Sequence, residues 1–171
     1  RIGVLKILKR MGVDIKLKNI KKYKGEKIAT ILVKSKEKIK PINCPVKLNS
    51  AAIDEFLLIF LVAAKANGIS YFKNLSELNQ KESPRLKWGS EILDKIGIRN
   101  KVYNNGIKIY GNPIIKTQKK IEIKKFLKDH RVFMTSIIAA LSFGGSWTIF
   151  DKDSINTSFP SFLKIINYLQ R

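Results

Sequence analysis

One arrangement recurs along this chain: an apolar helical stretch, then a glycine, then a short stretch rich in β-branched or aromatic residues. The clearest example is the apolar stretch over about 51–66, which ends before Gly68. A later stretch, over about 131–141, ends before Gly144-Gly145 in the same way. This order restricts the chain to folds in which helices alternate with strands.

The spacing inside this arrangement indicates a duplicated unit. Asp54 precedes Gly68 by the same interval at which Arg131 precedes Gly145. Equal offsets are typical of a repeated supersecondary unit, although an alternating chain can also produce one such match by chance. A duplication places equivalent helix starts on one face of a domain, so charged residues far apart in sequence can meet there.

The individual elements follow from periodicity and from glycine and proline positions. We expect helices over about 4–11, 51–66, 84–96 and 131–141, and another that begins at Pro160. We expect strands over about 13–17, 27–34, 69–72, 98–103, 107–110 and 147–150. Asn104-Asn105-Gly106 predicts a hairpin turn, and Ser83 is the expected N-cap of the helix near Pro84.

The stretch over 51–66 is apolar on nearly every side, which predicts a buried helix. Its longest apolar run, 56–64, is far shorter than the roughly 20 residues that span a bilayer. Cys44 is the single cysteine, so no internal disulfide can form, and this fits a cytoplasmic location. We interpret it as a buried, unreactive thiol. With one cysteine and one histidine, no metal site is expected.

The net charge is +21, from 34 lysines and arginines against 13 acidic residues. Such an excess is typical of proteins that bind polyanions. It is equally typical of a protein whose surface is rich in lysine because its gene is rich in A and T. AT-rich codons specify lysine, isoleucine and asparagine, and isoleucine and asparagine are also abundant here. The lysines are dispersed and are not interleaved with base-stacking aromatic residues. The surface interpretation is therefore favoured, and a basic nucleic-acid-binding module stays as an alternative.

Charged clusters stand at three helix starts: Asp54-Glu55, Lys81-Glu82 with Arg85, and Asp129-His130-Arg131. The first turn of a helix favours anions through its unpaired N–H groups and its dipole. Each cluster also has a structural interpretation. Asp54 could be a first-turn acid that only supports its helix, Lys81-Glu82 with Arg85 could be a solvated group of charges, and His130 could be a structural histidine. If the three converge, they form a site for a small, highly charged substrate.

Each cluster offers chemistry suited to such a substrate. Asp54, at the start of an apolar helix, is a candidate general base. Lys81 and Arg85 lie one helical turn apart and can bind carboxylate or phosphate. His130 stands beside Arg131 at a helix entrance and is interpreted as a ligand contact.

Taken in order, these segments resemble those of the 3-phosphoshikimate 1-carboxyvinyltransferases (EPSP synthases). The matching segments are 1–3, 11–15, 53–55, 74–78, 81–85, 129–131 with Met134, and 157–162. They cover nearly the whole chain. No single segment is decisive, but the ordered combination is specific.

The resemblance implies an α+β fold of repeated βαβαββ units, arranged in two similar domains with the active site in the cleft between them. Residues 1–171 would form most of the C-terminal domain, and the N-terminal domain would be absent from this chain. Since that domain supplies further substrate-binding residues, we expect no turnover from the chain alone.

The implied reaction transfers the enolpyruvyl group of phosphoenolpyruvate to the 5-hydroxyl of shikimate 3-phosphate, releasing phosphate. It belongs to the shikimate pathway, which leads through chorismate to the aromatic amino acids. It runs through a tetrahedral intermediate without a metal or other cofactor. The implied partners are the two substrates and the N-terminal domain, in a monomeric cytoplasmic enzyme, with no nucleic acid and no membrane.

The resemblance also assigns roles to residues. Asp54 matches the proton acceptor and Glu82 the candidate proton donor. Shikimate 3-phosphate would be bound by Asp54, Glu77 and Lys81. Phosphoenolpyruvate would be bound by Arg85, Arg131 and His130.

Two positions depart from the family pattern. Thr157 stands where some members have a phosphoenolpyruvate-binding lysine, and Pro84 stands where an acidic residue is commoner.

The related UDP-N-acetylglucosamine enolpyruvyl transferases are a close alternative. They carry an Asp-Leu-Arg-like run where this chain has Asp129-His130-Arg131, so the histidine favours the shikimate enzyme.

Overall fold

The computed structural model describes residues 2–34, 37–124 and 128–170; Arg1, which begins the first matching segment, lies outside them. The α-helices are α1 (Gly3–Arg10), α2 (Asn49–Ala52), α3 (Phe56–Ala64), α4 (Arg85–Ile96), α5 (His130–Phe143) and α6 (Phe162–Leu169). The strands are β1 (Asp14–Tyr23), β2 (Glu26–Lys34), β3 (Gly68–Phe72), β4 (Asn100–Tyr103), β5 (Gly106–Gly111), β6 (Lys120–Ile123) and β7 (Ser146–Ile149). Short 3₁₀ turns lie at Val46–Leu48, Ile53–Glu55, Ser76–Gln80 and Lys152–Ile155.

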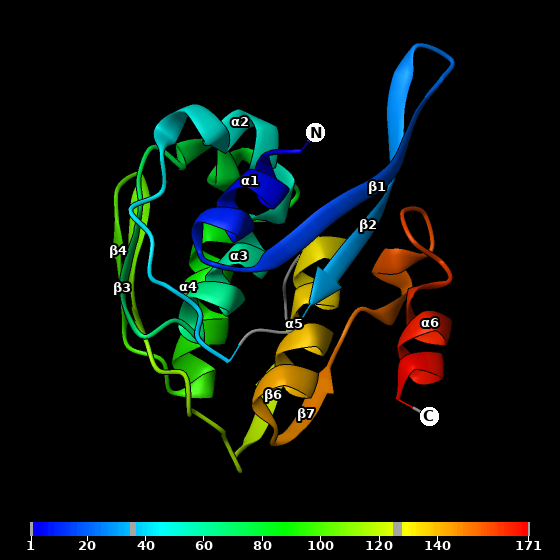
Figure 1. Ribbon diagram of the computed structural model, residues 1–171. Helices are drawn as coiled ribbons and strands as arrows, with labels where there is room; N and C mark the ends of the chain where they lie inside the picture. The colour runs from blue at the N-terminus through cyan, green and yellow to red at the C-terminus, as the bar shows by residue number, and fades with distance from the viewer. Residues whose placement is uncertain (1, 35–36, 125–127, 171) are drawn as a thin grey trace.

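The first expected helix and the first two expected strands are confirmed, although β1 extends to Tyr23, beyond the expected end at residue 17. α1 ends before Gly12, whose φ of +88° is a conformation that favours glycine. β1 and β2 then pair antiparallel, with an irregularity in register between Lys18 and Lys21. Figure 1 shows this hairpin projecting away from the helices, and most of its side chains are exposed.

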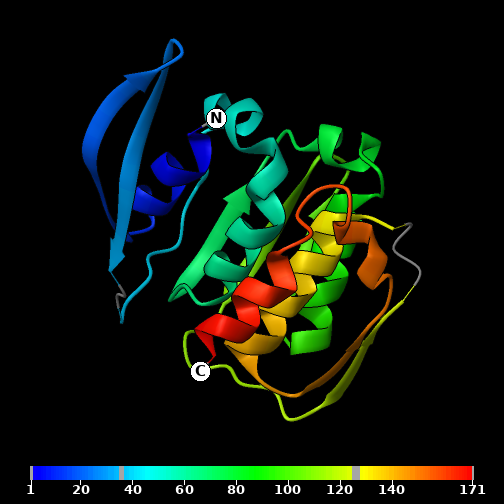
Figure 2. The same cartoon turned by 90° about the vertical axis from the view of Figure 1, so that its right-hand side faces the viewer.

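The middle of the chain forms a strand–helix–strand–helix–strand–strand unit. Residues 39–44 lie parallel to β3 through the bridges Ile39–Ala66 and Asn43–Tyr71. β3 then pairs with β5, and β5 pairs with β4, all antiparallel. The hairpin across residues 104–105 is therefore confirmed. In Figures 1 and 2 the sheet lies along one side of α3 and α4.

The beginning of this unit is repeated by β6, α5 and β7. β6 pairs parallel with β7, with Ile121 opposite Trp147, just as residues 39–44 run parallel to β3. The order is then continued by α6. The duplication predicted from the equal offsets is confirmed, and so is the α+β class. Sequence patterns missed β6, because a strand of four residues that begins with lysine carries too little periodicity to be recognised.

The prediction of one continuous helix over 51–66 was wrong. The backbone tightens into a 3₁₀ turn at Ile53–Glu55, which separates α2 from α3. At this break, the carbonyl oxygen of Asp54 accepts a hydrogen bond of 2.8 Å from Nη1 of Arg131. The break places the Asp54 side chain beside the starts of α4 and α5. α3 itself is buried along most of its length, as expected.

The core lies where α3 packs against α4 and the inner face of the β3–β5–β4 sheet. Phe56, Phe60 and Phe72 are almost fully buried there, with ring centroids 5.2–6.0 Å apart. Gly89, in the middle of α4, leaves room for the Phe60 ring: a Cβ at this position would lie 2.8 Å from Cδ2 of Phe60. This close approach fixes α4, and with it Arg85, against α3.

Gly89→Ala is therefore expected to destabilise the fold. Alanine favours the helix by about 0.5–1 kcal/mol, but overpacking a filled core costs about 1–3 kcal/mol. We expect the free energy of unfolding to fall by about 1–2 kcal/mol, measured by urea denaturation. Lys87→Ala, on the exposed side of the same helix, is the control and is expected to change it by less than about 0.5 kcal/mol. Equal stability of the two variants would contradict this packing argument.

Candidate active site

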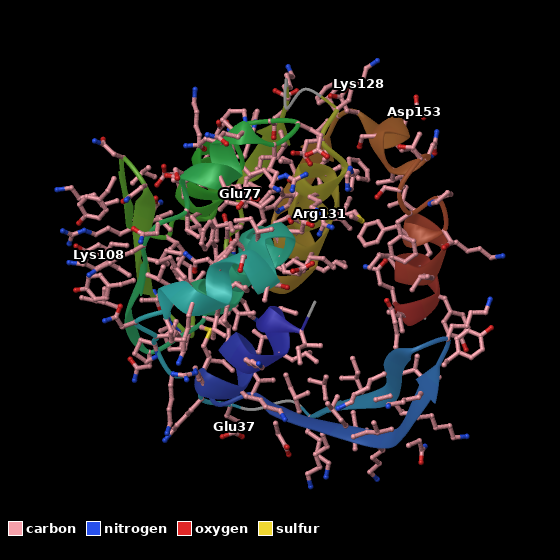
Figure 3. All side chains as sticks on the ribbon, turned by 90° about the horizontal axis from the view of Figure 1, so that it is seen from above. Glu37, Glu77, Lys108, Lys128, Arg131 and Asp153 are labelled. Atoms are coloured by element: carbon pink, nitrogen blue, oxygen red, sulfur yellow. The ribbon has the colours of Figure 1, made fainter. Side chains whose placement is uncertain are left out.

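The structure brings together the three charged helix starts. Asp54 lies on the 3₁₀ turn before α3, Arg85 opens α4, and Arg131 lies in the first turn of α5. Figure 3 looks down on this end of the molecule, with Glu77 and Arg131 labelled near the middle and Lys128 and Asp153 at the upper right edge. The convergence predicted from the sequence is confirmed.

Asp54 is the centre of this cluster. Its Oδ1 lies 3.3 Å from Nη1 of Arg85 and 3.9 Å from Nζ of Lys81. Its Oδ2 lies 3.6 Å from Nη2 of Arg131. The side chain keeps 15% of its surface exposed. One carboxylate that reaches solvent is thus surrounded by three cations.

Arg85 is more deeply buried than a surface substrate contact would be, with only 2% of its side chain exposed. Its Nε donates to Oδ2 of Asp129 at 2.8 Å, and its Nη2 lies 3.3 Å from Oδ1 of the same residue. Nη2 also donates to Oε2 of Glu82, and Nη1 donates to Asp54. The guanidinium is therefore held by three carboxylates, which compensate a charge that would otherwise be costly to bury.

Asp129 is completely buried and caps α5. Its Oδ1 accepts from the backbone N–H of Arg131 at 2.9 Å and of Val132 at 3.4 Å. Its Oδ2 also accepts from Oγ of Ser83 at 2.8 Å. Two of the first N–H groups of α5, those of Arg131 and Val132, are thus occupied by a carboxylate of the chain itself. The contact of His130 and Arg131 with a substrate at this helix start stays a prediction. The hydroxyl of Ser83 donates to Asp129 and does not cap α4, so the predicted Ser83 cap was wrong. The predicted start of this helix near Pro84 is confirmed, because α4 begins at Arg85.

The pKa of Asp129 is lowered below its ordinary value of 3.8. Burial acts to raise this pKa, but hydrogen bonds from Arg85 and Ser83, the charge of Arg85 and the N–H of Arg131 together outweigh it. The carboxylate is therefore ionised in the folded protein throughout the neutral and mildly acidic range.

This shift predicts how Asp129 contributes to stability as pH changes. A carboxylate with a lowered folded pKa stabilises the fold above its unfolded pKa, and the contribution is lost as pH falls through the folded value. We expect Asp129→Asn to reduce the free energy of unfolding by about 2 kcal/mol at about pH 6. The difference from wild type should shrink progressively below about pH 3.8. Urea unfolding across this range measures it, and a pH-independent difference would contradict the assignment.

The outer part of the cluster is acidic as well as basic. Nζ of Lys81 lies 2.9 Å from Oε1 of Glu77, and Nη1 of Arg131 lies 3.6 Å from Oε1 of Glu55. More than half of the Glu77 and Glu82 side-chain surfaces is exposed. The cluster as a whole contains three cations and five carboxylates, so the carboxylates outnumber the cations by two. The carboxylates are Asp54, Glu55, Glu77, Glu82 and Asp129.

Two predicted residues stand apart from these contacts. His130 opens α5 and is partly exposed, and its side chain forms no hydrogen bond or ion pair with the part of the chain that the structure describes. Thr157 is exposed and lines a hollow of about 320 Å³ together with Lys128 and three residues of the segment 151–154.

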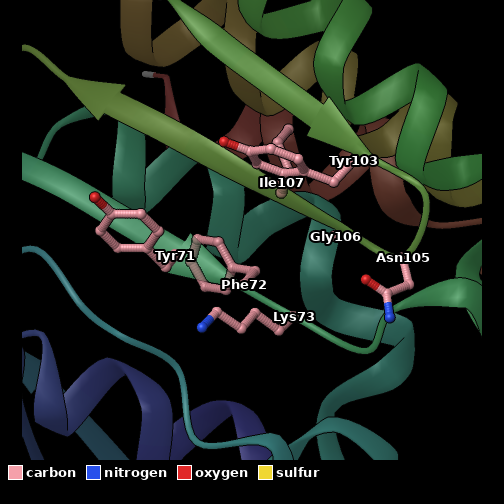
Figure 4. A pocket seen from close by; sticks show the side chains of 7 residues that line it. All are labelled: Tyr71, Phe72, Lys73, Tyr103, Asn105, Gly106 and Ile107. Carbon is pink, nitrogen blue, oxygen red and sulfur yellow. The ribbon is translucent and has the colours of Figure 1, made fainter.

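Other features lie outside the cluster. A hollow of about 390 Å³ lies over Gly106 between Tyr71 and Tyr103, at the end of the β3–β5–β4 sheet (Figure 4), and shares no lining residue with the cluster. Cys44 is 4% exposed, which confirms a buried thiol, and burial raises its pKa to about 11.

The described residues contain no group of three or more histidine, cysteine or acidic side chains placed to hold a metal ion. None of the described helices is both long enough and apolar enough to cross a membrane.

Sequence reasoning named Asp129 within a cluster but gave it no role of its own. The available signal was its position immediately before a helix, where aspartate is a preferred N-cap. Nothing in the sequence indicates that the same carboxylate also binds Arg85, because 44 positions separate the two residues.

Comparison with known proteins identifies the family. Residues 1–166 match the family model of EPSP synthase (3-phosphoshikimate 1-carboxyvinyltransferase). A 3-phosphoshikimate 1-carboxyvinyltransferase of Ruthia magnifica subsp. Calyptogena magnifica is 39% identical, covering 99% of this chain and 38% of that protein. One from Thermodesulfovibrio yellowstonii is 34% identical, covering 100% of this chain and 39% of that protein.

Solved structures of enolpyruvyl transferases are also similar to this chain. The EPSP synthase of Acinetobacter baumannii superposes with a TM-score of 0.88 at 34% identity, over 98% of this chain and 38% of that one. The enolpyruvyl transferase NikO of Streptomyces tendae shares the fold, with a TM-score of 0.68 at 16% identity over 95% of this chain and 33% of that one. This chain spans about 38% of the length of the first of these curated relatives. From its sequence match and its fold, the chain belongs to the EPSP synthase family.

Proposed function

We propose that this chain is part of an enzyme that transfers the enolpyruvyl group of phosphoenolpyruvate to the 5-hydroxyl of shikimate 3-phosphate and releases phosphate. The observation that carries the proposal is the meeting of Asp54, Lys81, Arg85 and Arg131 at one end of the molecule. These residues are the ones that the family resemblance assigns to the two substrates. Their separation in sequence makes a chance convergence a poor explanation.

The chemistry proposed for the cluster is addition followed by elimination. The 5-hydroxyl oxygen attacks C2 of phosphoenolpyruvate while Asp54 accepts the hydroxyl proton and Glu82 gives a proton to C3. The resulting tetrahedral intermediate then loses phosphate from C2 and a proton from C3, which restores the double bond. Cations fixed on rigid helix starts would stabilise the negative charges throughout.

The remaining assignments belong to the same proposal. Lys81 and Glu77, which contact each other at the edge of the cluster, would bind shikimate 3-phosphate together with Asp54. Arg85, Arg131 and His130 would bind phosphoenolpyruvate. Residues 1–171 would form most of the C-terminal domain, and a second domain would close the cleft over both substrates. We propose that the complete enzyme acts in the cytoplasm as a monomer.

The direct test uses a full-length protein that contains this chain. With phosphoenolpyruvate and shikimate 3-phosphate, we expect release of one phosphate for each enolpyruvyl product, measured by a phosphate assay and mass spectrometry. With UDP-N-acetylglucosamine as acceptor, we expect no product. Transfer to the nucleotide sugar, or no transfer to either acceptor, would overturn the proposal.

A basic nucleic-acid-binding module is the rival of a different class. It would predict binding to single or double strands that weakens steeply with salt and that survives Arg85→Ala and Arg131→Ala. The cluster of cations with carboxylates disfavours it, because Glu77 and Glu82 would repel a phosphate backbone.

A further inference from the structure

A single buried carboxylate joins two of the helix starts that form the cluster. Asp129 has no exposed surface, and its two oxygens accept from the side chain of Arg85, the hydroxyl of Ser83 and the backbone of Arg131. Ser83 and Arg85 belong to the start of α4, whereas Arg131 belongs to α5. Asp54 also contacts both arginines, but Asp129 is the fully buried carboxylate that connects the two helix starts.

The contacts of Arg85 differ between the two edges of its guanidinium. Asp129 lies along the edge formed by Nε and Nη2, with distances of 2.8 Å and 3.3 Å. Asp54 and Glu82 occupy the other edge, formed by Nη1 and Nη2. Each edge of a guanidinium can bind one carboxylate through two N–H groups.

The carboxylates at the two edges also differ in how easily they can leave. The Glu82 side chain is 54% exposed and Asp54 is 15% exposed, so water can replace their contacts with Arg85. Asp129 is fully buried and cannot turn to solvent without leaving α5 uncapped. An incoming anion can therefore exchange only with the ligands of the Nη1–Nη2 edge.

We propose that Asp129 is a positioning residue: it holds Arg85 from behind, so that the Nη1–Nη2 edge meets the anionic group of phosphoenolpyruvate, and it sets Arg131 beside it. This inference rests on the proposed function. Without the rear carboxylate, the long arginine side chain would sample several rotamers, and binding would have to order it again. Asp129 itself touches no substrate.

A residue that only stabilised the fold would give different kinetics from one that aims Arg85. In the first case, Asp129→Asn would affect both substrates alike and would do so whatever residue stands at position 85. In the second, its effect would fall on phosphoenolpyruvate and would depend on Arg85, because contacting residues are coupled. Lysine at position 85 has no Nε–Nη2 edge for Asp129 to hold.

The test is a double-mutant cycle in the full-length enzyme with Asp129→Asn, Arg85→Lys and the pair, and with Asp94→Asn as an exposed aspartate control on α4. KM and kcat are measured for each substrate. We expect Asp129→Asn to raise KM for phosphoenolpyruvate on the order of tenfold and to change KM for shikimate 3-phosphate less than about twofold. In the Arg85→Lys background, the same substitution should change the phosphoenolpyruvate KM less than about twofold.

Each other outcome is decisive. Equal increases in both KM values, an undiminished effect in the Arg85→Lys background, or no effect of Asp129→Asn in an active enzyme would overturn the positioning role. An inactive wild-type enzyme would instead overturn the proposed function, and the inference would fall with it. Asp94→Asn is expected to match wild type.

Discussion

Residues 1–171 by themselves are expected to release no phosphate from phosphoenolpyruvate and shikimate 3-phosphate above the buffer blank. The cluster has three cations, and its carboxylates outnumber them by two. Lys81, Arg85 and Arg131 therefore already have acidic partners. Two multiply charged substrates need additional cations and a site closed to water, and the proposed function assigns both to a second domain.

The comparison that makes this result interpretable is a protein of the full length of its relatives. A phosphate assay on equal concentrations should give turnover for that protein and none for the chain alone. Cooperative urea unfolding of the chain would separate missing residues from a missing fold. Steady phosphate release that requires both substrates and only these residues would contradict the expectation.

The fold could be predicted from the sequence wherever local signals were strong. Gly12 and Gly97 end helices at positive φ, and the turn before Gly106 joins two strands, as the pattern indicated. The prediction failed where the local structure depends on contacts between residues that are far apart in the sequence. The break at Ile53–Glu55 is associated with a hydrogen bond from Arg131, 77 positions away, and no periodicity within residues 51–66 records that contact.

The same division applies to the candidate site. Helix starts and charged residues are visible in sequence, so the meeting of Asp54, Arg85 and Arg131 could be predicted from the duplication and the family resemblance. The burial of Arg85 could not, because arginine is usually exposed and its buried partner, Asp129, lies on another helix. Sequence patterns thus identified the residues of the cluster, but not which of them face solvent and which hold the others in place.

In the full-length enzyme, Asp54→Asn is expected to lower kcat on the order of a hundredfold or more. The amide side chain would keep nearly the same shape but could not take up the proton of the substrate hydroxyl. The substitution would also remove the negative charge that lies 3.3 Å from Arg85 and 3.6 Å from Arg131. Those arginines would keep Asp129 and Glu55 as acidic partners, so the fold should survive.

The measurement for Asp54→Asn is kcat at saturating concentrations of both substrates, together with the dissociation constant of shikimate 3-phosphate. Because the amide oxygen can still accept a hydrogen bond, we expect binding to weaken much less than turnover. Asp94→Asn makes the same chemical change at an exposed position whose Oδ1 accepts from Asn100, and should leave kcat unchanged. A wild-type kcat in Asp54→Asn would remove this residue as the proton acceptor, whereas an equal loss of binding and turnover would assign it to substrate binding alone.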